Sequence, residues 1–446
     1  MSRNQAVLEA IDQHRIKLRG AAQLRGELTV PGDKSISHRS VIFNAIASGE
    51  AFITNFLPGE DCLSSIECMR AMGVEIELDD TARTVRVKGK SIRGLTESAE
   101  VLNAGNSGTT TRLLTGLLSG QNFYSVITGD SSLRSRPMGR VINPMRQMGA
   151  QIWGRKGDTL APLSIKGTTL KGINYSLPVA SAQLKSAILL AALYAEGETH
   201  LSGLIDSRDH TERMLKAMGA PLLVSAEELV MKGPATELIA QNVSVPGDIS
   251  SAAFWLVAAS VHPDADLTLK NVGVNPTRTG IIDVLGEMGA NITLINEREV
   301  AGEPVADIRV VSAELRGTSV SGNLIPRLVD EIPALAVAAI LARSNTCISD
   351  AAELRVKETD RIATICSELG QLGAILEAHP DGMTIQAGAK LRGATVQSHG
   401  DHRMAMSLAI AGLLLPEGEE LEIADYRCAD VSYPGFWSDL EKIIII

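Results

Sequence analysis

The sequence contains only five cysteines among 446 residues, and no two of them form a CxxC pair. An odd, scattered set of cysteines favours neither a disulfide framework nor a cysteine zinc site. The eight histidines also lack the spacing of metal ligands. We therefore expect reduced cysteines that pack as small apolar side chains, and no metal site.

Long apolar runs are missing as well. The longest, residues 332–342, is far shorter than the roughly 18 to 20 residues that a membrane-spanning helix requires. The first twenty residues mix acidic and basic side chains with isolated apolar ones, unlike a secretory signal or a transit peptide. These features predict a cytoplasmic protein that does not enter a membrane.

The chain has no excess of positive charge. It carries 42 Lys and Arg against 52 Asp and Glu, a formal net charge of -10, which argues against a nucleic-acid partner. The glycine-rich stretch 105–111 does not end in GK[ST], so no nucleotide-binding P-loop is predicted. With 45% hydrophobic and 21% charged residues, the composition is that of a globular protein of two or three domains.

What the sequence does contain is a repeated helix ending. Five segments rich in Met and Leu end in a glycine, at positions 73, 149, 219, 289 and 373, and a β-type segment follows each. Such glycines end a helix in the left-handed conformation. They recur every 70 to 84 residues, and residues 436–443 resemble a sixth helix of this type, cut short.

A second helix type alternates with the first. It begins with a polar cluster near residues 33, 106, 181, 248, 330 and 401, and continues for about three turns of Ala, Leu, Ile and Val. A helix that is apolar all round is buried. Six α/β units of about 70 residues, each with two helices and several strands, therefore account for nearly the whole chain.

The repeat also predicts where the chain divides. The segment 30–35, Val-Pro-Gly-Asp-Lys-Ser, recurs three units later at 245–250 as Val-Pro-Gly-Asp-Ile-Ser. We expect two domains of three units each, residues 32–246 and 247–446, with residues 1–31 pairing with the second. The two Pro-Gly sites would be the crossovers, and a cleft between the domains is the expected ligand site.

Polar groups gather at the starts of the buried helices. The stretch 102–112, Leu-Asn-Ala-Gly-Asn-Ser-Gly-Thr-Thr-Thr-Arg, places two glycines at a helix N-terminus, where backbone N–H groups bind anions; an ordinary capped helix is the alternative. The basic residues at or near the helix starts along the chain are Lys34, Arg39, Arg112, Arg134, Arg136, Lys185, Arg208, Arg278, Arg355, Lys357, Arg361 and Arg403. If they converge, they form a site for small polyanions, since guanidinium groups bind carboxylate and phosphate bidentately.

Four carboxylates lie within this basic setting: Asp330, Glu331, Glu358 and Asp401. Beside cations they stay ionised and serve as bases or as helix caps. For Asp401 we favour capping, whereas for Asp330 and Glu358 spacing alone leaves both roles open. His402 is either a proton carrier or a histidine whose ring is simply hydrogen-bonded near a helix start.

Five segments together resemble the EPSP synthase (3-phosphoshikimate 1-carboxyvinyltransferase) family, in its second branch: 31–39, 103–112, 129–138, 355–362 (RVKETDRI) and 400–406 (GDHRMAM). The resemblance implies an α/β fold of two inverse α/β-barrel-like domains, each of three βαβαββ repeats. It also implies carboxyvinyl transfer from phosphoenolpyruvate to the 5-hydroxyl of shikimate 3-phosphate, on the way to chorismate and the aromatic amino acids. The family uses no metal or cofactor, and we expect a monomer.

The resemblance assigns site residues position by position. Those for shikimate 3-phosphate are Lys34, Ser35, Arg39, Ser181, Ala182, Gln183, Ser207, Arg208, Asp330 and Lys357. Those for phosphoenolpyruvate are Lys34, Gly108, Arg136, Gln183, Arg361 and Arg403. The implied catalytic residues are Asp330 for the hydroxyl, with Glu358 and Lys34 for the methylene group. The substrate phosphate would lie on the side of the first domain, and phosphoenolpyruvate and catalysis on that of the second.

Some positions depart from the best-known branch, which has a second serine at Ala182 and a lysine at Val431. Gly108 is not replaced by alanine, so the resemblance implies inhibition by glyphosate. The main alternative is UDP-N-acetylglucosamine enolpyruvyl transferase, which usually has a cysteine in the loop that corresponds to 129–137, where this chain has none. A nucleic-acid clamp is disfavoured by the net acidity.

Overall fold

The computed structural model describes residues 7–300 and 302–445. The chain forms two compact units. The N-terminal unit comprises Gly32–Pro246 together with Glu299–Glu303, and the rest of the described chain forms the C-terminal unit. Within the described ranges, none of the helices has the length and hydrophobicity that crossing a bilayer requires.

Each unit contains three β-sheets. Those of the N-terminal unit are ordered β15-β4-β6-β5, β7-β8-β10-β9 and β11-β12-β14-β13. Their strands are β4 (Glu50–Thr54), β5 (Glu75–Asp79), β6 (Thr84–Lys88), β7 (Leu102–Asn103), β8 (Tyr124–Thr128), β9 (Gln151–Gly154), β10 (Leu160–Lys166), β11 (Asn174–Leu177), β12 (Gly197–Gly203), β13 (Leu222–Val224), β14 (Leu229–Gly233) and β15 (Val243–Ser244).

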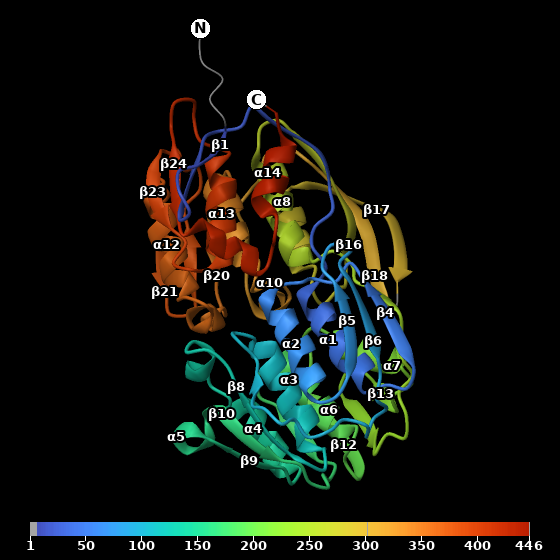
Figure 1. The fold of residues 1–446 in the computed structure, drawn as a ribbon. Coiled ribbons are helices and arrows are strands. Elements are labelled where there is room, and N and C mark those ends of the chain that lie inside the picture. The colour runs from blue at the N-terminus through green and yellow to red at the C-terminus, as the bar shows by residue number, and fades with distance from the viewer. Residues whose placement is uncertain (1–6, 301, 446) are drawn as a thin grey trace. The chain divides into compact units, whose positions relative to one another are not determined.

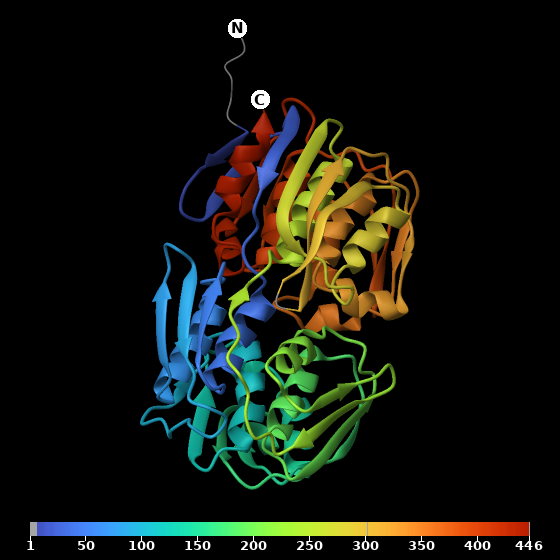
Figure 2. The same cartoon turned by 90° about the vertical axis from the view of Figure 1, so that its right-hand side faces the viewer.

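The sheets of the C-terminal unit are ordered β17-β18-β16-β3-β25, β19-β20-β22-β21 and β1-β2-β24-β23. Their strands are β1 (Leu8–Ala10), β2 (Arg15–Leu18), β3 (Gln23–Leu28), β16 (Ala265–Gly273), β17 (Asn291–Val300), β18 (Glu303–Val311), β19 (Ser319–Val320), β20 (Thr346–Ile348), β21 (Leu376–His379), β22 (Gly382–Ile385), β23 (Ala394–Gln397), β24 (Leu421–Ala424) and β25 (Ile444–Ile445). In Figure 2 the blue strand β3 runs beside the yellow-green strand β16, which pairs with β18 on its other side.

All six sheets follow one plan. A strand pairs in parallel with the next strand of its sheet, and a hairpin adds two antiparallel strands, as in β11, β12, β14 and β13. With the helices in between, this is a βαβαββ unit. The six predicted α/β units are therefore confirmed.

Two sheets take their parallel strand from a distant part of the chain. β15 pairs with β4, and β3 pairs with β16. The sixth sheet takes its hairpin, β1 and β2, from the start of the chain, through the pairing of β2 with β24. The last helix, α14 (Phe436–Ile443), is not shortened as we expected, since α7 (His210–Ala217) and α9 (Gly280–Glu287) also have eight residues. What the chain end lacks is the hairpin, which residues 8–18 supply.

The inner helices form the centre of each unit. They are α1 (Lys34–Ala45), α3 (Gly108–Ser119) and α6 (Ala182–Ala192) in the N-terminal unit, and α8 (Ile249–Val261), α11 (Ile332–Leu341) and α13 (His402–Gly412) in the C-terminal unit. Nine of the ten residues of α11 are buried, as expected for a helix without charged residues. Figures 1 and 2 show the strands of each unit outside these helices.

The outer helices end as predicted. They are α2 (Glu60–Ala71), α4 (Gly139–Gln147) and α7 in the N-terminal unit, and α9, α12 (Arg361–Gln371) and α14 in the other. The five glycines have φ angles of 86° to 100°, which confirms the left-handed helix endings. Shorter helices are α5 (Arg155–Asp158), α10 (Ile325–Leu328) and the 3-10 turns η1 (Leu133–Ser135), η2 (Gly322–Leu324), η3 (Ala352–Val356) and η4 (Tyr426–Val431).

Polar caps open five of the six inner helices. The side chains of Asp33, Ser107, Ser181, Asp248 and Asp401 each accept a hydrogen bond from a backbone N–H of the first turn. The capping role predicted for Asp401 is therefore confirmed. Capping fixes where each helix begins, so the side chains of each first turn have defined positions.

Candidate active-site residues in the two units

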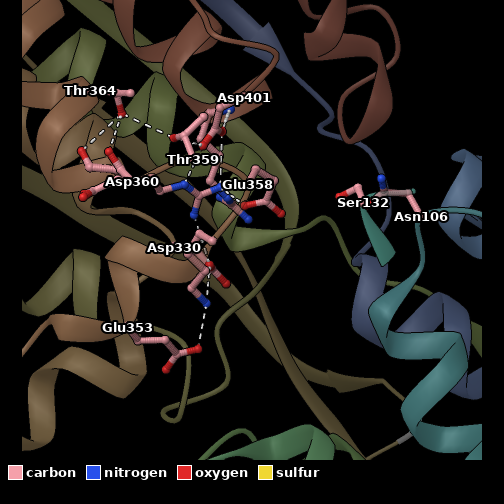
Figure 3. A network of polar contacts seen from close by, with 12 residues as sticks. Asn106, Ser132, Asp330, Glu353, Glu358, Thr359, Asp360, Thr364 and Asp401 are labelled. Carbon is pink, nitrogen blue, oxygen red and sulfur yellow. Dashed lines mark hydrogen bonds and ion pairs between the residues drawn. The ribbon is translucent and has the colours of Figure 1, made fainter. Parts of the chain in front are cut away.

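A buried guanidinium group is the centre of the polar cluster in the C-terminal unit. Arg361, the first residue of α12, is 1% exposed. Its Nε lies 2.8 Å from Asp401 Oδ2 and its Nη2 lies 2.6 Å from Glu358 Oε2. Its Nη1 is 3.5 Å from Asp330 Oδ1. Three carboxylates from three segments thus surround one cation (Figure 3).

The charges in this cluster support one another. Burial alone lowers the pKa of Arg361, but the carboxylates of Glu358 and Asp401 outweigh it and raise that pKa. Burial disfavours the charged form of Asp401, but the paired guanidinium holds the pKa of Asp401 below its ordinary value. Nη1 of Arg361 makes no hydrogen bond to any described residue. Arg361 and Asp401 are therefore both ionised at neutral pH, and Arg361 retains donor capacity for an anion.

Two further predicted cations lie around this centre. Lys357 Nζ lies 3.5 Å from Asp330 Oδ1 and 3.0 Å from Glu353 Oε1. Arg403 follows the cap of α13, and its Nη1 is 4.0 Å from the buried Glu331. The C-terminal unit therefore brings Asp330, Lys357, Glu358, Arg361 and Arg403 close to one another.

A second buried network lies beneath Arg403. Ser250 donates a hydrogen bond to Glu331, and Arg278 Nη2 lies 2.8 Å from Ser250 Oγ and 2.9 Å from Asp248 Oδ1. Asp248 caps α8, while Glu331 lies at the start of α11. This network fixes the starts of α8 and α11. Glu331 therefore has a structural role.

In the N-terminal unit, Gly108 lies between two guanidinium groups. A Cβ atom at Gly108 would lie 2.7 Å from Arg112 Nη1 and 3.5 Å from Arg136 Nη1. Arg112 donates to Gln183 Oε1 at 2.7 Å. Arg136 donates to Asn106 Oδ1 at 2.5 Å, and Asn106 is labelled in Figure 3. Gly108, Arg136 and Gln183 therefore meet at the N-terminus of α3, with Arg112 as a cation that the resemblance did not assign.

Lys34 has a partner that the sequence did not reveal. Its Nζ donates to Asp61 Oδ2 at 3.1 Å, across 27 residues of sequence. Burial disfavours the charged form of Asp61, but Lys34 holds the pKa of Asp61 below its ordinary value. Asp61 lies in the first turn of α2. In the sequence it belongs to no motif and looks like an ordinary surface carboxylate, so its pairing with Lys34 is not predicted from the sequence.

The predicted residues for shikimate 3-phosphate in the N-terminal unit lie on α1, around the start of α6 and in the loop before α7, and the buried Arg39 is one of them. Arg39 donates from Nε to Thr211 Oγ1 at 2.7 Å, from Nη2 to Ser186 Oγ at 2.8 Å and from Nη1 to the carbonyl of Ser35 at 2.9 Å. Burial lowers the pKa of Arg39 to about 10, so it remains charged at neutral pH. Ser181 caps α6, which Ala182 begins. Ser207 is buried and Arg208 is half-buried in the loop before α7.

His38 makes the N-terminal unit sensitive to acid. It lies on α1 with Nδ1 2.8 Å from Ser65 Oγ, and burial lowers its pKa to about 3 from an ordinary 6.5. Below pH 6.5 the unfolded chain binds a proton that the folded chain refuses, so His38 lowers stability as the pH falls toward 3. We expect His38→Asn to reduce the pH dependence of the unfolding free energy by about 1.4 kcal/mol per pH unit between pH 6 and 4.

Urea denaturation of the wild type and His38→Asn at several pH values measures this slope. The matched control is His14→Asn, because His14 is exposed. Equal slopes for the wild type and His38→Asn would contradict the neutral, buried state of His38.

Among residues 7–300 and 302–445, no three His, Cys, Asp or Glu side chains are grouped to hold a metal ion. The polar clusters of the two units combine cations, carboxylates and helix N-termini. This combination binds phosphate and carboxylate groups and holds acid–base side chains beside them.

Comparisons with known proteins agree with this chemistry. The family profile described as EPSP synthase (3-phosphoshikimate 1-carboxyvinyltransferase) matches residues 18–440. A curated 3-phosphoshikimate 1-carboxyvinyltransferase from Herpetosiphon aurantiacus is 58% identical over 425 residues, covering 95% of this chain and 98% of the relative.

Solved structures give the same result. An EPSP synthase from Acinetobacter baumannii is 43% identical, with a TM-score of 0.88 over 97% of this chain and 98% of that one. The enolpyruvyl transferase NikO from Streptomyces tendae covers 96% and 97% with a TM-score of 0.78, but at 17% identity it supports the fold alone. The predicted enolpyruvyl transferase fold is confirmed. With a family match along nearly its whole length and a relative at 58% identity, the chain belongs to the EPSP synthase (3-phosphoshikimate 1-carboxyvinyltransferase) family.

Proposed function

We propose that this protein transfers the carboxyvinyl group of phosphoenolpyruvate to the 5-hydroxyl of shikimate 3-phosphate and releases phosphate. Membership of the family supports the reaction. The observation that carries the proposal is the cluster around Arg361, where Asp330 and Glu358 lie beside cations. Proton-transfer groups and anion-binding groups are thus held together, as a reaction between two anions requires.

The cations of both units take part in binding. Phosphoenolpyruvate is bound by Lys34, Gly108, Arg136, Gln183, Arg361 and Arg403. Shikimate 3-phosphate is bound by Lys34, Ser35, Arg39, Ser181, Ala182, Gln183, Ser207, Arg208, Asp330 and Lys357. Guanidinium groups suit the carboxylate and phosphate of these substrates because they donate two parallel hydrogen bonds. Gly108 lets the enol substrate approach the N–H groups that begin α3.

The reaction proceeds by addition and elimination. The 5-hydroxyl oxygen of shikimate 3-phosphate bonds to C2 of phosphoenolpyruvate while Asp330 takes the hydroxyl proton. The methylene carbon of phosphoenolpyruvate gains a proton from Glu358 or Lys34. In the resulting tetrahedral intermediate the residue that gave this proton takes one back from the methyl group, the bond from C2 to the phosphate oxygen breaks, and the double bond reforms. Cations near the departing phosphate stabilise its charge.

Phosphate release tests the reaction directly. The purified protein is incubated with phosphoenolpyruvate and either shikimate 3-phosphate or UDP-N-acetylglucosamine, and free phosphate is measured. We expect release only with shikimate 3-phosphate. Release only with the nucleotide sugar would refute the proposal in favour of the sister activity, and release with neither would refute both.

Replacing Gly108 by alanine tests the phosphoenolpyruvate side. A methyl group there would lie 2.7 Å from Arg112 Nη1, so that guanidinium must move. We expect the KM for phosphoenolpyruvate to rise by roughly tenfold, equivalent to the 1 to 3 kcal/mol cost of overpacking. We also expect glyphosate to inhibit the wild type and to inhibit Gly108→Ala less. Steady-state kinetics at varied phosphoenolpyruvate measures both effects.

Gly286→Ala is the matched control for this change. Gly286 lies in α9, and an added Cβ would meet nothing within 4 Å. Its kinetics should equal those of the wild type. An unchanged KM in Gly108→Ala, or a wild type that resists millimolar glyphosate at low phosphoenolpyruvate, would remove Gly108 from the binding residues.

We propose further that the protein works as a cytoplasmic monomer on small-molecule substrates. The net charge of -10 disfavours a nucleic-acid partner. Analytical ultracentrifugation of the purified protein tests the assembly state, and a dimer at micromolar concentration would contradict it.

A further inference from the structure

The first turn of α7 carries three consecutive buried polar residues. His210, Thr211 and Glu212 are at most 4% exposed, and each has a partner on a different segment. His210 Nδ1 is 2.8 Å from Glu303 Oε1, and Thr211 Oγ1 accepts from Arg39 at 2.7 Å. Glu212 pairs with Lys185. A helix start this polar and this buried implies a task beyond filling the core.

Lys185 is the residue that holds the preceding loop. Its side chain is 2% exposed, and its Nζ lies 3.0 Å from the carbonyl oxygen of Ile205 and 3.2 Å from that of Ser207. The third contact, 2.5 Å to Glu212 Oε1, uses the last of its three N–H donors. All donors of this ammonium group therefore have acceptors, and two of the acceptors are main-chain atoms of the loop.

The loop depends on these contacts for its position. Residues 204–209 contain no helix or strand, so no ladder of backbone hydrogen bonds fixes Ser207 and Arg208. Lys185 lies in the rigid inner helix α6 and Glu212 in α7. The pair therefore ties the loop to two helices, directly before the half-buried Arg208.

The local charge balance also involves this pair. Burial lowers the pKa of Arg39, and Glu212 is the carboxylate that opposes this most, ahead of Asp33 and Glu303. Glu212 thus interacts with two cations, with Lys185 by direct contact and with Arg39 electrostatically. Removing its charge would leave both cations with less compensation before any anionic ligand arrives.

A contribution to stability alone does not explain the pair. Buried ion pairs usually stabilise a fold no better than apolar residues of similar volume, since two charges must leave water. Glu212 pairs with Lys185 through Oε1, and its other oxygen, Oε2, makes no hydrogen bond to a described residue. Lys185 is therefore the main partner of the Glu212 carboxylate. An apolar pair would fill the same space, but it would not hold the two carbonyl groups of the loop.

We infer that Lys185 and Glu212 are positioning residues that hold Ser207 and Arg208 ready for the phosphate group of shikimate 3-phosphate. This inference rests on the proposed function. The pair does not touch the substrate. It sets the affinity for the phosphorylated ligand by keeping the loop in place before binding.

The double variant Lys185→Met/Glu212→Leu tests this inference. It removes both charges and keeps similar volumes, so we expect a thermal midpoint close to that of the wild type. The dissociation constant for shikimate 3-phosphate, measured by titration calorimetry, should rise roughly 10- to 100-fold. The KM for shikimate 3-phosphate should rise by the same factor, because a displaced loop weakens binding of the phosphate group of this substrate. The KM for phosphoenolpyruvate should stay within about twofold of the wild-type value.

The exposed pair Lys232 and Glu198, also in the N-terminal unit, is the matched control. Lys232→Met/Glu198→Leu should bind shikimate 3-phosphate like the wild type, because surface ion pairs contribute little. The single variant Lys185→Met should be less stable than the double variant, since it leaves Glu212 buried without its cation.

Wild-type affinity for shikimate 3-phosphate in the Lys185 and Glu212 double variant would overturn the inference, and so would a double variant that does not fold, because the pair would then serve stability. A wild-type protein that neither binds shikimate 3-phosphate nor releases phosphate with it would instead refute the proposed function. The two failures are therefore distinguishable.

Discussion

Replacing Arg361 by methionine is expected to lower kcat/KM for phosphoenolpyruvate by at least roughly 10³-fold, because it removes the cation at the centre of the C-terminal cluster. Arg361 is 1% exposed and pairs with Asp401, Glu358 and Asp330. Without it three carboxylates face one another, two of them less than a sixth exposed. We therefore also expect a loss of about 3 to 5 kcal/mol in the free energy of unfolding.

Arg361→Lys separates the effect on binding from the effect on folding. Lysine keeps the positive charge, but its compact ammonium group does not reproduce the planar fork that contacts the carboxylates. We expect this variant to be more stable than Arg361→Met, yet to show a strongly raised KM for phosphoenolpyruvate. Urea denaturation and steady-state kinetics on both variants supply the measurements.

Arg343→Met is the matched control, since Arg343 lies in the same unit but is 64% exposed, beside Glu314. Its stability and kinetics should stay close to those of the wild type. An Arg361→Lys variant with wild-type kinetics would show that the guanidinium group is not needed for phosphoenolpyruvate.

Replacing Asp330 by asparagine is expected to lower kcat by about 10² to 10⁴ while shikimate 3-phosphate still binds. Asparagine has the same size and keeps an oxygen acceptor near Lys357 and Arg361, each 3.5 Å from Asp330 Oδ1. An amide cannot accept the proton of the 5-hydroxyl. The loss should therefore appear in kcat more than in the dissociation constant for shikimate 3-phosphate.

Single-turnover kinetics and titration calorimetry distinguish these two quantities. Asp266→Asn serves as the control, because Asp266 pairs with Arg309 on the surface of the same unit and is 36% exposed. Unimpaired turnover in Asp330→Asn would exclude Asp330 as the base. If the affinity of Asp330→Asn for shikimate 3-phosphate fell by the same factor as kcat, Asp330 would only bind this substrate and would not act as a base.

Features that depend on neighbouring residues were predictable from the sequence. The glycines at 73, 149, 219, 289 and 373 end helices because only glycine adopts the left-handed conformation at little cost. Asp33, Ser107, Ser181, Asp248 and Asp401 cap helices because their oxygen atoms reach the next turn. The fully apolar runs predicted the buried inner helices for the same local reason.

Strand pairing between distant segments was only partly predictable. The repeat indicated six units, but the last one seemed to end with a shortened helix. In the structure its hairpin comes from β1 and β2, at the other end of the chain. A strand can pair with any edge that it reaches, so its partner is set by the packed sheet and not by its own residues.

The sequence by itself determined the repeat, the helix boundaries, the family and the residue types that bind anions, because periodicity, capping and motifs act over a few residues. Only the tertiary structure decided which charges meet: Lys34 with Asp61, Lys185 with Glu212, and Arg361 with Asp401. These partners lie 27 to 40 residues apart in the chain. Their side chains come within hydrogen-bonding distance because α1 and α6 pack within the N-terminal unit and α13 packs within the C-terminal unit, and each packing is a property of that unit's whole core.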